Sequence, residues 1–418
     1  MPSGTCCAIR GFARSSASVV AGSSWNATRA HGWRRPWRLT IRISILAFDL
    51  SDNSTGRAEL LARLLTPRHE VTVVGPRFGG DLWPPVRTSA TVYRARPGRR
   101  YPLFSADLAR LARLADGDLL YASKPRATSF GVALVARRQR PRPLLLDVDD
   151  WEMGFFFRSG AWGRVGRALN VGNPNGLPWT WLCERFVRRA DAVTVASRFL
   201  QSRFGGTLIP HVRDTDAWDP ARYDRAEARA RLGVGAQPLV MFLGTPRGYK
   251  GVDDLVAAVD RLGGEARLAL VGADPGGASA RRWAVSPHVT LVGEIPFDDV
   301  PRYLAAADVV AVPQRATSDT IGQVPAKIFD AMALGRPIVA TAVSMIPEIL
   351  EGAGIVVPAG DIGALSEAIR RLLKDRDEAA ALGRRARDRC VARYSFSAAR
   401  RLLFPLIDEI ADRHTSSK

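Results

Sequence analysis

The segment Leu239-Val-Met-Phe-Leu243-Gly244-Thr-Pro-Arg247-Gly-Tyr-Lys250-Gly251 decides the fold that we predict. Its first five residues are all apolar, which indicates a strand buried on both faces rather than the alternating pattern of a half-exposed strand. Glycine, threonine and proline then end the strand, and a helix pattern follows over Val252 to Leu262. A buried strand followed directly by a helix is the repeating unit of a parallel sheet that is covered by helices.

The same strand-helix unit recurs on both sides of this segment. Helix patterns over Arg57–Leu65, Ala106–Leu114, Pro325–Leu334 and Ile362–Lys374 separate further buried runs. These runs predict parallel strands throughout. The other predicted strands are Ile41–Phe48, Val71–Val74, Leu119–Tyr121, Leu144–Leu146, Ala192–Val195, Thr207–Ile209, Arg267–Val271, Val289–Val292, Val309–Val312, Ile338–Ala340 and Ile355–Val357.

This pattern predicts an α/β protein with two doubly wound, Rossmann-like domains that face each other across a cleft. We expect an N-terminal domain over 39–212, a loose linker over 213–236 and a C-terminal domain over 237–395. A last helix over 396–418 is expected to pack back towards the first domain. Ligands of open α/β sheets bind beyond the carboxyl ends of the strands, so we expect the functional site in the cleft.

Composition excludes several classes of protein. A chain of 418 residues with 46% hydrophobic and 24% charged residues is long enough for two cores and typical of globular proteins. No run of eighteen apolar residues is present, so we expect no membrane-spanning helix. Four cysteines are too few for a disulfide framework and favour a reducing compartment such as the cytoplasm.

The formal net charge of +19 is unevenly distributed. Residues 1–42 contain seven arginines and no lysine or acidic residue, which leaves +12 on the rest of the chain. Residues 1–38 have the composition of a transit peptide, but a disordered tail or a start codon assigned too far upstream is the interpretation that we favour. The remaining excess favours anionic partners, namely phosphorylated substrates, anionic lipid surfaces or nucleic acid.

Two segments of the second domain have the chemistry of phosphate binding. In the first, Arg247, Lys250 and the amides of a glycine-rich turn meet where a helix begins. In the second, Gly322-Gln323-Val324-Pro325-Ala-Lys327 opens a helix whose free amides form another anion site. Asp330 lies in this helix and is expected to accept hydrogen bonds from sugar hydroxyls. The alternatives are a solvated turn for the first segment and an exposed helix carboxylate for Asp330.

These segments resemble the family 4 retaining glycosyltransferases of the GT-B fold. Gly244–Gly251 resembles their glycine, basic residue and Lys-Gly element, and Gly322–Pro337 their Glu-x7-Glu helix with its Ala-Met-Ala-x-Gly-x-Pro continuation. Ile209–Asp214 resembles the interdomain turn, and Val343–Glu348, which includes Ser344, the donor-side loop. The resemblance implies a nucleotide-diphosphate sugar as co-substrate, no other cofactor and no essential metal. It further implies that configuration is retained by same-face attack, without a protein nucleophile.

The resemblance assigns roles to the residues quoted above. Arg247 and Lys250 would stabilise the charge that develops on the leaving diphosphate. The remaining donor-side residues would bind the nucleotide sugar. They are Gly244, Thr245, Gly322, Gln323, Val324, Lys327, Asp330 and Ser344.

The sequence departs from the family pattern at three positions. Gly322 stands where the first glutamate is expected, and Asp330 replaces the second. Where many relatives have a histidine after a first-domain strand, this chain reads Leu146-Asp147-Val-Asp149-Asp150-Trp151. We expect Asp149 or Asp150 to orient the acceptor hydroxyl. Helix capping by one of them is nearly as favoured, and a metal site of the Asp-x-Asp type is a minor alternative.

The acceptor side is predicted to lie in the first domain. Thr55, Gly56 and Arg57 follow the first strand and are expected to face the cleft, and Trp151 begins a long aromatic loop that ends near Arg167. Aromatic and basic residues together are typical of a membrane interface. We therefore expect a cytoplasmic protein that binds the inner face of an anionic membrane.

The predicted function is hexose transfer from a nucleotide sugar to a hydroxyl of a saccharide or lipid-linked acceptor, in cell envelope or polysaccharide biosynthesis. A nicotinamide oxidoreductase is excluded because no Gly-x-Gly-x-x-Gly follows an opening strand. Two alternatives stay open. One is a sugar-nucleotide epimerase or hydrolase of related fold, and the other is a basic nucleic-acid-binding protein, although we expect no nucleic-acid partner.

Overall fold

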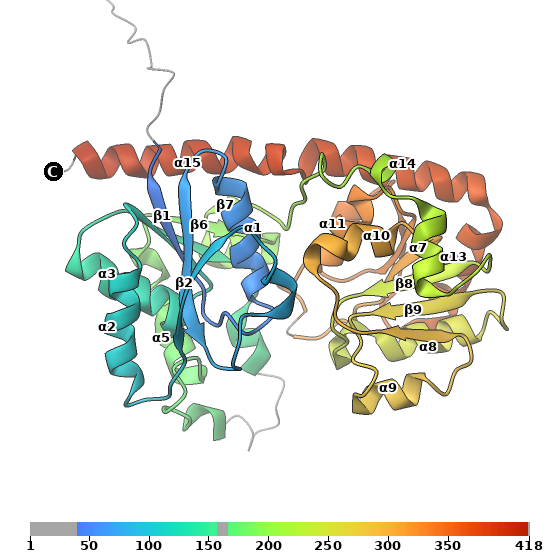
Figure 1. Ribbon diagram of the computed structural model, residues 1–418, viewed down its shortest axis with the longest axis horizontal. Coiled ribbons are helices and arrows are strands. Elements are labelled where there is room, and N and C mark those ends of the chain that lie inside the picture. Colours follow the sequence, from blue (N-terminus) through green and yellow to red (C-terminus); the bar gives the residue numbers. More distant parts are fainter. Residues whose placement is uncertain (1–39, 157–165, 319, 417–418) are drawn as a thin grey trace, which may run out of the picture. The chain divides into compact units, whose positions relative to one another are not determined.

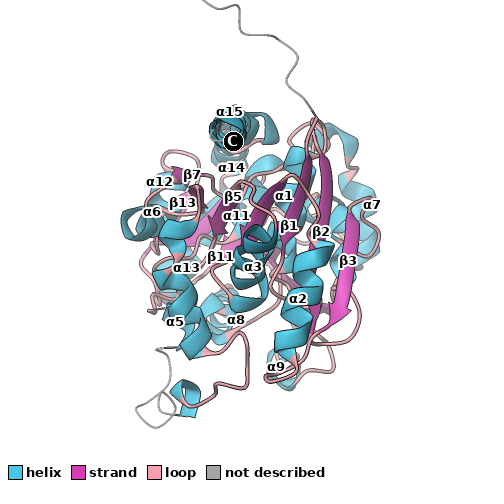
Figure 2. Cartoon of the chain, turned by 90° about the vertical axis from the view of Figure 1, so that its left-hand side faces the viewer, coloured by secondary structure: helices cyan, strands magenta, loops and turns pink. Residues whose placement is uncertain are grey.

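A computed structural model of the chain describes residues 40–156, 166–318 and 320–416, except for the side chain of residue 278. Residues 40–418 form one compact unit. It contains two parallel sheets with helices packed on them, which confirms the predicted fold of two Rossmann-like domains (Figures 1 and 2). The predicted tail over 1–38 and residues 157–165 of the aromatic loop lie outside the described residues.

The first sheet has the strand order β3-β2-β1-β4-β5-β6-β7, and every pair of neighbours is parallel. The order reverses at β1, so the loops after β1 and β4 lie at a topological switch point, where α/β sheets bind ligands. The strands are β1 (Arg42–Leu46), β2 (Glu70–Arg77), β3 (Val92–Pro97), β4 (Leu119–Ser123), β5 (Leu144–Val148), β6 (Ala192–Val195) and β7 (Thr207–Leu208).

The second sheet has the order β10-β9-β8-β11-β12-β13, again fully parallel, and reverses at β8. Gly244 and Arg247 follow β8 directly and therefore lie at its switch point. The strands are β8 (Leu239–Leu243), β9 (Arg267–Val271), β10 (Val289–Val292), β11 (Val309–Val312), β12 (Ile338–Thr341) and β13 (Ile355–Val357).

Helices cover both faces of each sheet, which explains why the strands read as continuous apolar runs. In β1, Ile43 and Ile45 belong to one buried cluster, whereas Leu46 belongs to the cluster on the other face. The helices are α1 (Thr55–Leu65), α2 (Phe104–Leu114), α3 (Val132–Gln139), α5 (Leu177–Arg185), α6 (Arg198–Phe204), α7 (Arg225–Leu232), α8 (Val252–Asp260), α9 (Ala278–Trp283), α10 (Val300–Leu304), α11 (Ala326–Ala333), α12 (Ile346–Leu350), α13 (Ile362–Lys374), α14 (Arg376–Arg393) and α15 (Phe396–Ser416).

The elements that were not predicted include the edge strand β3 and helix α7. The edge strand β3 reads Val-Tyr-Arg-Ala-Arg-Pro and is mostly exposed, so it lacks the apolar run by which the other strands were recognised. Helix α7 lies inside the stretch 213–236 that we expected to be loose. Asp224 caps α7 by accepting a hydrogen bond of 2.7 Å from the backbone N–H of Glu227, a local stabilisation that offsets a highly charged sequence.

The last helix packs against the first domain. Arg68 forms an ion pair of 2.8 Å with Asp408 of α15, and Arg400 Nε donates to the carbonyl of Leu64 at 2.9 Å. Helix α15 therefore ties the end of the chain to α1. Among the helices that the structure describes, none combines the length and apolar character needed to cross a bilayer.

Candidate functional site

A cavity with a volume of about 900 Å³ is lined by loops that follow strands of both sheets. The first domain contributes the loop after β1, from Phe48 to Arg57, and Asp149 and Asp150 after β5. The second domain contributes Gly244 and its neighbours after β8. All these loops leave carboxyl ends of parallel strands, as the sequence predicted for a ligand site.

The turn after β8 brings two cations to the cavity wall. Gly244 has a φ of +105°, a conformation that favours glycine, and a Cβ there would lie 3.7 Å from Lys327 Nζ. Arg247 and Lys250 both line the cavity. Lys250 is held in place because its ammonium donates a hydrogen bond of 2.7 Å to the carbonyl oxygen of Thr245.

A third cation, Lys327, comes from the first turn of α11. Its ammonium lies 3.5 Å from the centre of the Phe242 ring, a cation–π contact in a buried setting. Burial, and then the charge of Lys250, lower the pKa of Lys327 well below its usual value. Burial and the charge of Arg247 lower the pKa of Lys250 to about 8.

No carboxylate of the described residues forms an ion pair with Arg247, Lys250 or Lys327. Backbone amides at the start of α11 add partial positive charge, because Pro325 precedes the first helical residue and the first-turn N–H groups lack partners in the helix. Gln323 and Val324 line the same part of the cavity. The second-domain wall is therefore an uncompensated positive site suited to a di-anion.

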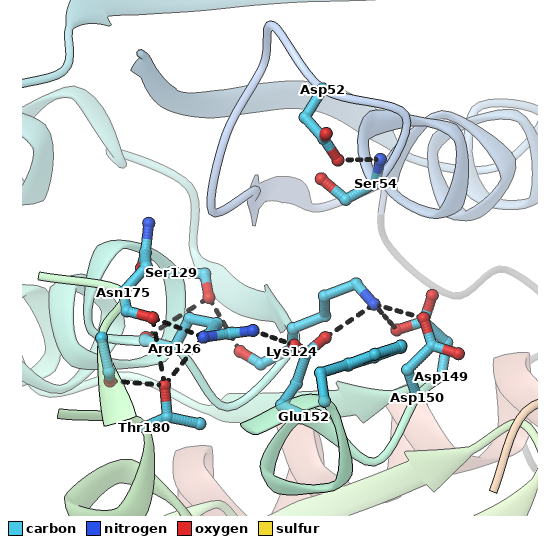
Figure 3. Close-up of polar contacts among 12 residues, drawn as sticks. Asp52, Ser54, Lys124, Arg126, Ser129, Asp149, Asp150, Glu152, Asn175 and Thr180 are labelled. Atoms are coloured by element: carbon cyan, nitrogen blue, oxygen red, sulfur yellow. Dashed lines mark hydrogen bonds and ion pairs between the residues drawn. The ribbon is translucent and has the colours of Figure 1, made fainter. Parts of the chain in front are cut away.

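The first-domain wall is a compensated cluster around Lys124, which follows β4. The Lys124 ammonium lies 2.8 Å from a carboxylate oxygen of each of Asp149, Asp150 and Glu152 (Figure 3). The backbone of Lys124 has a φ of +73°, and its N–H donates to the carbonyl of Asp147 at 2.8 Å. An unusual backbone conformation held by a neighbouring strand thus aims this lysine at three acids.

Arg126 fixes the far side of the same cluster. It pairs with Glu152 and donates to Thr180 Oγ1 at 2.8 Å (Figure 3). Although burial raises the pKa of Glu152, Arg126 and Lys124 outweigh it and lower that pKa to about 2. For Lys124, the three carboxylates outweigh burial and raise its pKa well above the usual range.

Asp149 is the exception among these acids. Burial raises its pKa to about 7, opposed by Lys124 and reinforced by Asp150 and Asp147. The side chain is buried yet lines the cavity, so its carboxylate is available to a ligand there. A carboxylate that titrates near neutral pH is suited to accept a proton from a hydroxyl group.

The two acids of Asp147-Val-Asp149 do not converge on one point. Asp147 is fully buried and forms a two-fold ion pair with Arg57, with Nε–Oδ2 and Nη2–Oδ1 distances of 2.8 Å. The acids that do converge are Asp149, Asp150 and Glu152, and the ammonium of Lys124 already binds all three. The geometry therefore does not fit a metal site of the Asp-x-Asp type.

Two acceptor-side predictions in the loop after β1 need correction. Thr55 does not line the cavity, because its hydroxyl donates back to the carbonyl of Asp49 at 2.9 Å and closes the loop. Gly56 lines the cavity as predicted. Arg57 also borders it, but its guanidinium is buried against Asp147 and the carbonyl of Ile209, so its charge is already compensated.

Trp151 and Gly322 pack against each other instead of lining the cavity. A Cβ at position 322 would lie 3.0 Å from a Phe199 ring carbon and 3.1 Å from Trp151 Cβ, so any side chain there requires these neighbours to shift by a few tenths of an ångström. The carbonyl of Gly322 accepts a hydrogen bond of 2.9 Å from Ser197. This tight contact between the domains corrects both predictions and accounts for the glycine.

Ser344 and Asp330 also differ from the expectation. Ser344 lies in a turn with a φ of +52° outside the cavity lining. Asp330 does line the cavity, but its carboxylate pairs with the buried Arg213. Burial raises the pKa of Asp330 despite this arginine. Its first partner is therefore within the protein rather than a sugar hydroxyl.

Sequence reasoning missed four residues at the site: Lys124, Arg126, Glu152 and His211. The first two follow a predicted strand in Ser123-Lys-Pro-Arg126, at the sheet edge where functional residues are expected. His211 lines the cavity, and burial, followed by the charges of Arg57, Arg213 and Lys124, lowers its pKa well below the usual value. Its imidazole is therefore neutral at neutral pH.

Comparisons with known proteins agree with this geometry. Residues 54–215 match a sequence model described as glycosyl transferase 4-like domain, and residues 237–375 match one described as glycosyl transferases group 1. The chain is 34% identical over 247 residues to a GDP-mannose-dependent alpha-(1-6)-phosphatidylinositol monomannoside mannosyltransferase of Mycolicibacterium smegmatis, covering 53% of this chain and 65% of that protein. It is 28% identical over 184 residues to the alpha-D-kanosaminyltransferase of Streptomyces kanamyceticus, covering 42% and 46% of the two chains.

Solved structures share the fold at low sequence identity. HepE of Anabaena, crystallised with UDP and glucose, superposes with a TM-score of 0.68 at 19% identity, over 88% of this chain and 99% of that one. A sucrose-phosphate synthase of Thermosynechococcus elongatus superposes with a TM-score of 0.66 at 22% identity, over 88% and 98%. The alignments span less than two thirds of the length of the two curated relatives named above. From the two matched domains, the paired parallel sheets and these relatives, the chain belongs to the family 4, group 1 glycosyltransferases of the GT-B fold.

Proposed function

We propose that this protein transfers a hexose from a nucleoside diphosphate sugar to a hydroxyl of a saccharide or lipid-linked acceptor. The observation that carries the proposal is the cluster of Arg247, Lys250 and Lys327, which has no carboxylate partner among the described residues and borders the cavity. Binding a diphosphate supplies the missing negative charge. The relatives that use GDP-mannose make it the first donor to test.

The same cations favour the departure of the diphosphate. When the anomeric bond breaks, negative charge grows on the leaving oxygen while the sugar becomes oxocarbenium-like. Fixed cations and amide dipoles aimed at that oxygen stabilise the transition state more than the ground state. Arg247 and Lys250 are therefore assigned to the leaving group, and Lys327 with the first turn of α11 to the phosphate nearest to them.

Asp149 is assigned to the acceptor hydroxyl. It lies in the wall opposite the cations and is the only acid of the Lys124 cluster, within the described residues, whose pKa is raised to about 7. As the hydroxyl attacks the anomeric carbon, its proton passes to the carboxylate. Lys124 acts as a positioning residue, since its ammonium holds Asp149 and favours the ionised form.

Transfer is proposed to retain the anomeric configuration and to need no bound metal. The hydroxyl attacks from the face that the diphosphate leaves, so a protein nucleophile is not required. The cations supply the charge that a divalent metal would otherwise supply, and Lys124 occupies the centre of the acid cluster. Proton NMR of the product's anomeric linkage and assays after EDTA treatment test these two points.

The decisive experiment measures ligand binding and turnover together. Thermal unfolding is recorded with GDP-mannose, UDP-glucose, ADP-glucose and dTDP-glucose, because a donor present at 100 Kd adds about 2.7 kcal/mol of stability. The stabilising donor is then incubated with candidate acceptors. Sugar transfer that requires an acceptor supports the proposal. Free sugar or an epimer formed without acceptor would support the epimerase or hydrolase alternative. Nucleic-acid binding without donor binding would support the alternative of a basic nucleic-acid-binding protein.

Contact with an anionic membrane is proposed for the first domain. Trp181 of α5 is 51% exposed, and the guanidinium of Arg185 lies 5.2 Å from its ring centre. Leu169 and Phe186 of the same domain are also exposed, so this domain presents apolar as well as basic groups to solvent. The protein would then act at the cytoplasmic face, where anionic lipids attract arginines.

Sedimentation with vesicles tests this contact. The wild-type protein is expected to bind phosphatidylglycerol vesicles and not phosphatidylcholine vesicles, and Trp181→Ala is expected to weaken binding. Val285→Ala, at an even more exposed apolar residue in the second domain, is the control. Equal binding by both variants would refute a role for the Trp181 surface.

A further inference from the structure

A second cavity lies at the end of the second sheet that faces away from the site described above. Its volume is about 580 Å³, which is within the range of small-molecule sites. Pro238, Asp308 and Pro337, which line it, directly precede β8, β11 and β12, so it opens at the amino ends of these strands. The site described above borders the carboxyl ends, and the two cavities share no lining residue.

The wall of this second cavity is strongly basic. It contains five arginines and two aspartates, and therefore has an excess of three positive charges. One aspartate, Asp308, is already paired with Arg225 at 2.6 Å and with Arg229 at 3.2 Å. The arginines of the wall are Arg225, Arg336, Arg376, Arg384 and Arg387.

Arg336 is held in this wall by main-chain carbonyls. Its Nε donates to the carbonyl of Leu334 at 3.0 Å and its Nη1 to that of Ala305 at 3.3 Å, which leaves Nη2 with no partner among residues 40–156, 166–318 and 320–416. Burial, and then the nearby Arg225, lower its pKa. A half-buried guanidinium without a carboxylate partner has lost hydration that an anion would restore.

Three further arginines of the wall also lack an acidic partner. Arg387 donates only to main-chain carbonyls, including that of Ala333 at 2.6 Å. Arg376 and Arg384 lie on α14 and have no hydrogen bond or ion pair with any residue that the structure describes. A concave wall with an excess of positive charge raises the local concentration of anions. The side chains of Arg376 and Arg384, which have no such bonds, are free to turn towards a ligand.

We propose that this second cavity binds a small soluble polyanion, a molecule with two or more phosphate groups, at a site separate from the donor site. Guanidinium groups bind phosphate oxygens in a two-fold geometry, which matches an arginine-rich wall better than a lysine-rich one. Leu334–Pro337 line the cavity directly after α11, and Lys327 lies in the first turn of that helix. The two anion sites are thus at opposite ends of one helix of about 12 Å.

The test is a calorimetric titration of the full chain with inorganic tripolyphosphate at about 0.15 M ionic strength, where non-specific surface attraction is screened. The wild-type protein is expected to bind two equivalents. Arg376→Ala/Arg384→Ala is expected to retain one equivalent and to weaken binding at the other at least tenfold. Arg247→Ala/Lys250→Ala is expected to lose the equivalent that binds at the donor site and to keep the one in the second cavity. Failure of the donor site and failure of this site are therefore distinguishable.

Arg110→Ala/Arg113→Ala is the matched control, because it removes the same charge from exposed positions of α2. It is expected to bind two equivalents. Arg336→Gln provides an independent variant, expected to weaken the same site as the α14 pair. The proposal is overturned if the wild-type protein binds only one equivalent that Arg247→Ala/Lys250→Ala abolishes, or if the α14 variant binds as the control does.

Discussion

Lys124 and Lys327 are buried lysines in opposite walls of one cavity, and their surroundings have opposite electrostatic character. Three carboxylates surround Lys124 at 2.8 Å, and its pKa is raised. Lys327 faces an aromatic ring and another lysine, and its pKa is lowered. The charge of Lys124 is already compensated within the protein. Lys327 has a charge that the protein leaves to be compensated by a ligand.

This difference separates two kinds of experiment. Removing a group from a compensated pair leaves its partner buried and uncompensated, so the loss is expected mainly in stability or in the properties of the partner. Removing an uncompensated cation relieves repulsion in the free protein, so the loss is expected in catalysis and binding. The four predictions below test this distinction, from the largest effect to the smallest.

Asp330→Ala is expected to lower the free energy of unfolding by about 3–5 kcal/mol, because it leaves the buried Arg213 without its carboxylate. Denaturation with urea measures the change. In Arg213→Met/Asp330→Leu no unpaired charge remains, so the double variant is expected to lose less. Equal losses in the two variants would show that packing, and not charge compensation, is the main contribution of this pair.

Lys250→Ala is expected to lower kcat about 10²- to 10³-fold, the usual effect of removing one group that stabilises developing negative charge. Its unfolding midpoint is expected to stay the same or to rise. Steady-state assays with the stabilising donor measure the rate, and Lys374→Ala, at an exposed position of α13, is the control. Unchanged turnover in Lys250→Ala would remove this lysine from the mechanism.

Lys124→Met is expected to lower the rate about 10- to 100-fold at pH 7 through its effect on the proposed base. Asp149 is active when ionised, so the rate of the wild-type protein is expected to fall as pH drops through about 7. Lys124 lowers the pKa of Asp149, so without it this limb of the pH profile moves to higher pH and activity recovers as pH rises.

Lys124→Arg keeps the positive charge and is the control for this pH shift. It is expected to retain the wild-type profile more closely than Lys124→Met. A uniform loss at every pH in Lys124→Met would instead indicate a purely structural role for Lys124. The profiles of kcat are measured from pH 5.5 to 9.5.

Lys327→Met is expected to raise the free energy of unfolding at pH 7, because burial and the charge of Lys250 disfavour the protonated lysine in the folded protein. The pKa of Lys327 is lowered in the folded protein. Between this lowered pKa and the ordinary lysine pKa of about 10, the unfolded chain therefore binds more protons than the folded protein. Wild-type stability should therefore rise with pH through this range, and the variant should lack that contribution.

Urea denaturation of Lys327→Met at pH 7 and pH 9 measures both effects, and donor binding should be weakened in the same variant. A less stable variant at pH 7 would contradict the interpretation of Lys327 as an uncompensated cation. It would mean that the contact with Phe242 outweighs the lost hydration.

Much of the fold was predictable because its strands are buried on both faces. Runs such as Leu239–Leu243 are apolar throughout. A short run of this kind is typical of a parallel strand that is buried on both faces. The edge strand β3 was missed for the same reason, since it is solvated and alternates arginine with less polar residues. Cations next to a glycine turn, such as Arg247 and Lys250, were predictable because the helix that follows fixes where they lie.

The acceptor-side site was less predictable because it depends on contacts between distant segments. Lys124 and Asp149 are 25 positions apart and meet because β4 and β5 are neighbours in the sheet. Asp147 and Asp149 look equivalent in the sequence, yet the first is paired with Arg57 from another loop. Gly322 was recognised only as the position of a missing glutamate, and the tertiary structure alone shows that Phe199 and Trp151 crowd this position.

The amino-acid sequence alone thus determined the alternation of buried strands and helices, because periodicity and turn chemistry act over a few residues. This alternation also determined at which end of each sheet the polar loops lie. Which charges in those loops are compensated was decided only by the tertiary structure. Compensation requires opposite charges within about 4 Å, a distance set by strand order and domain contact and not by separation along the chain.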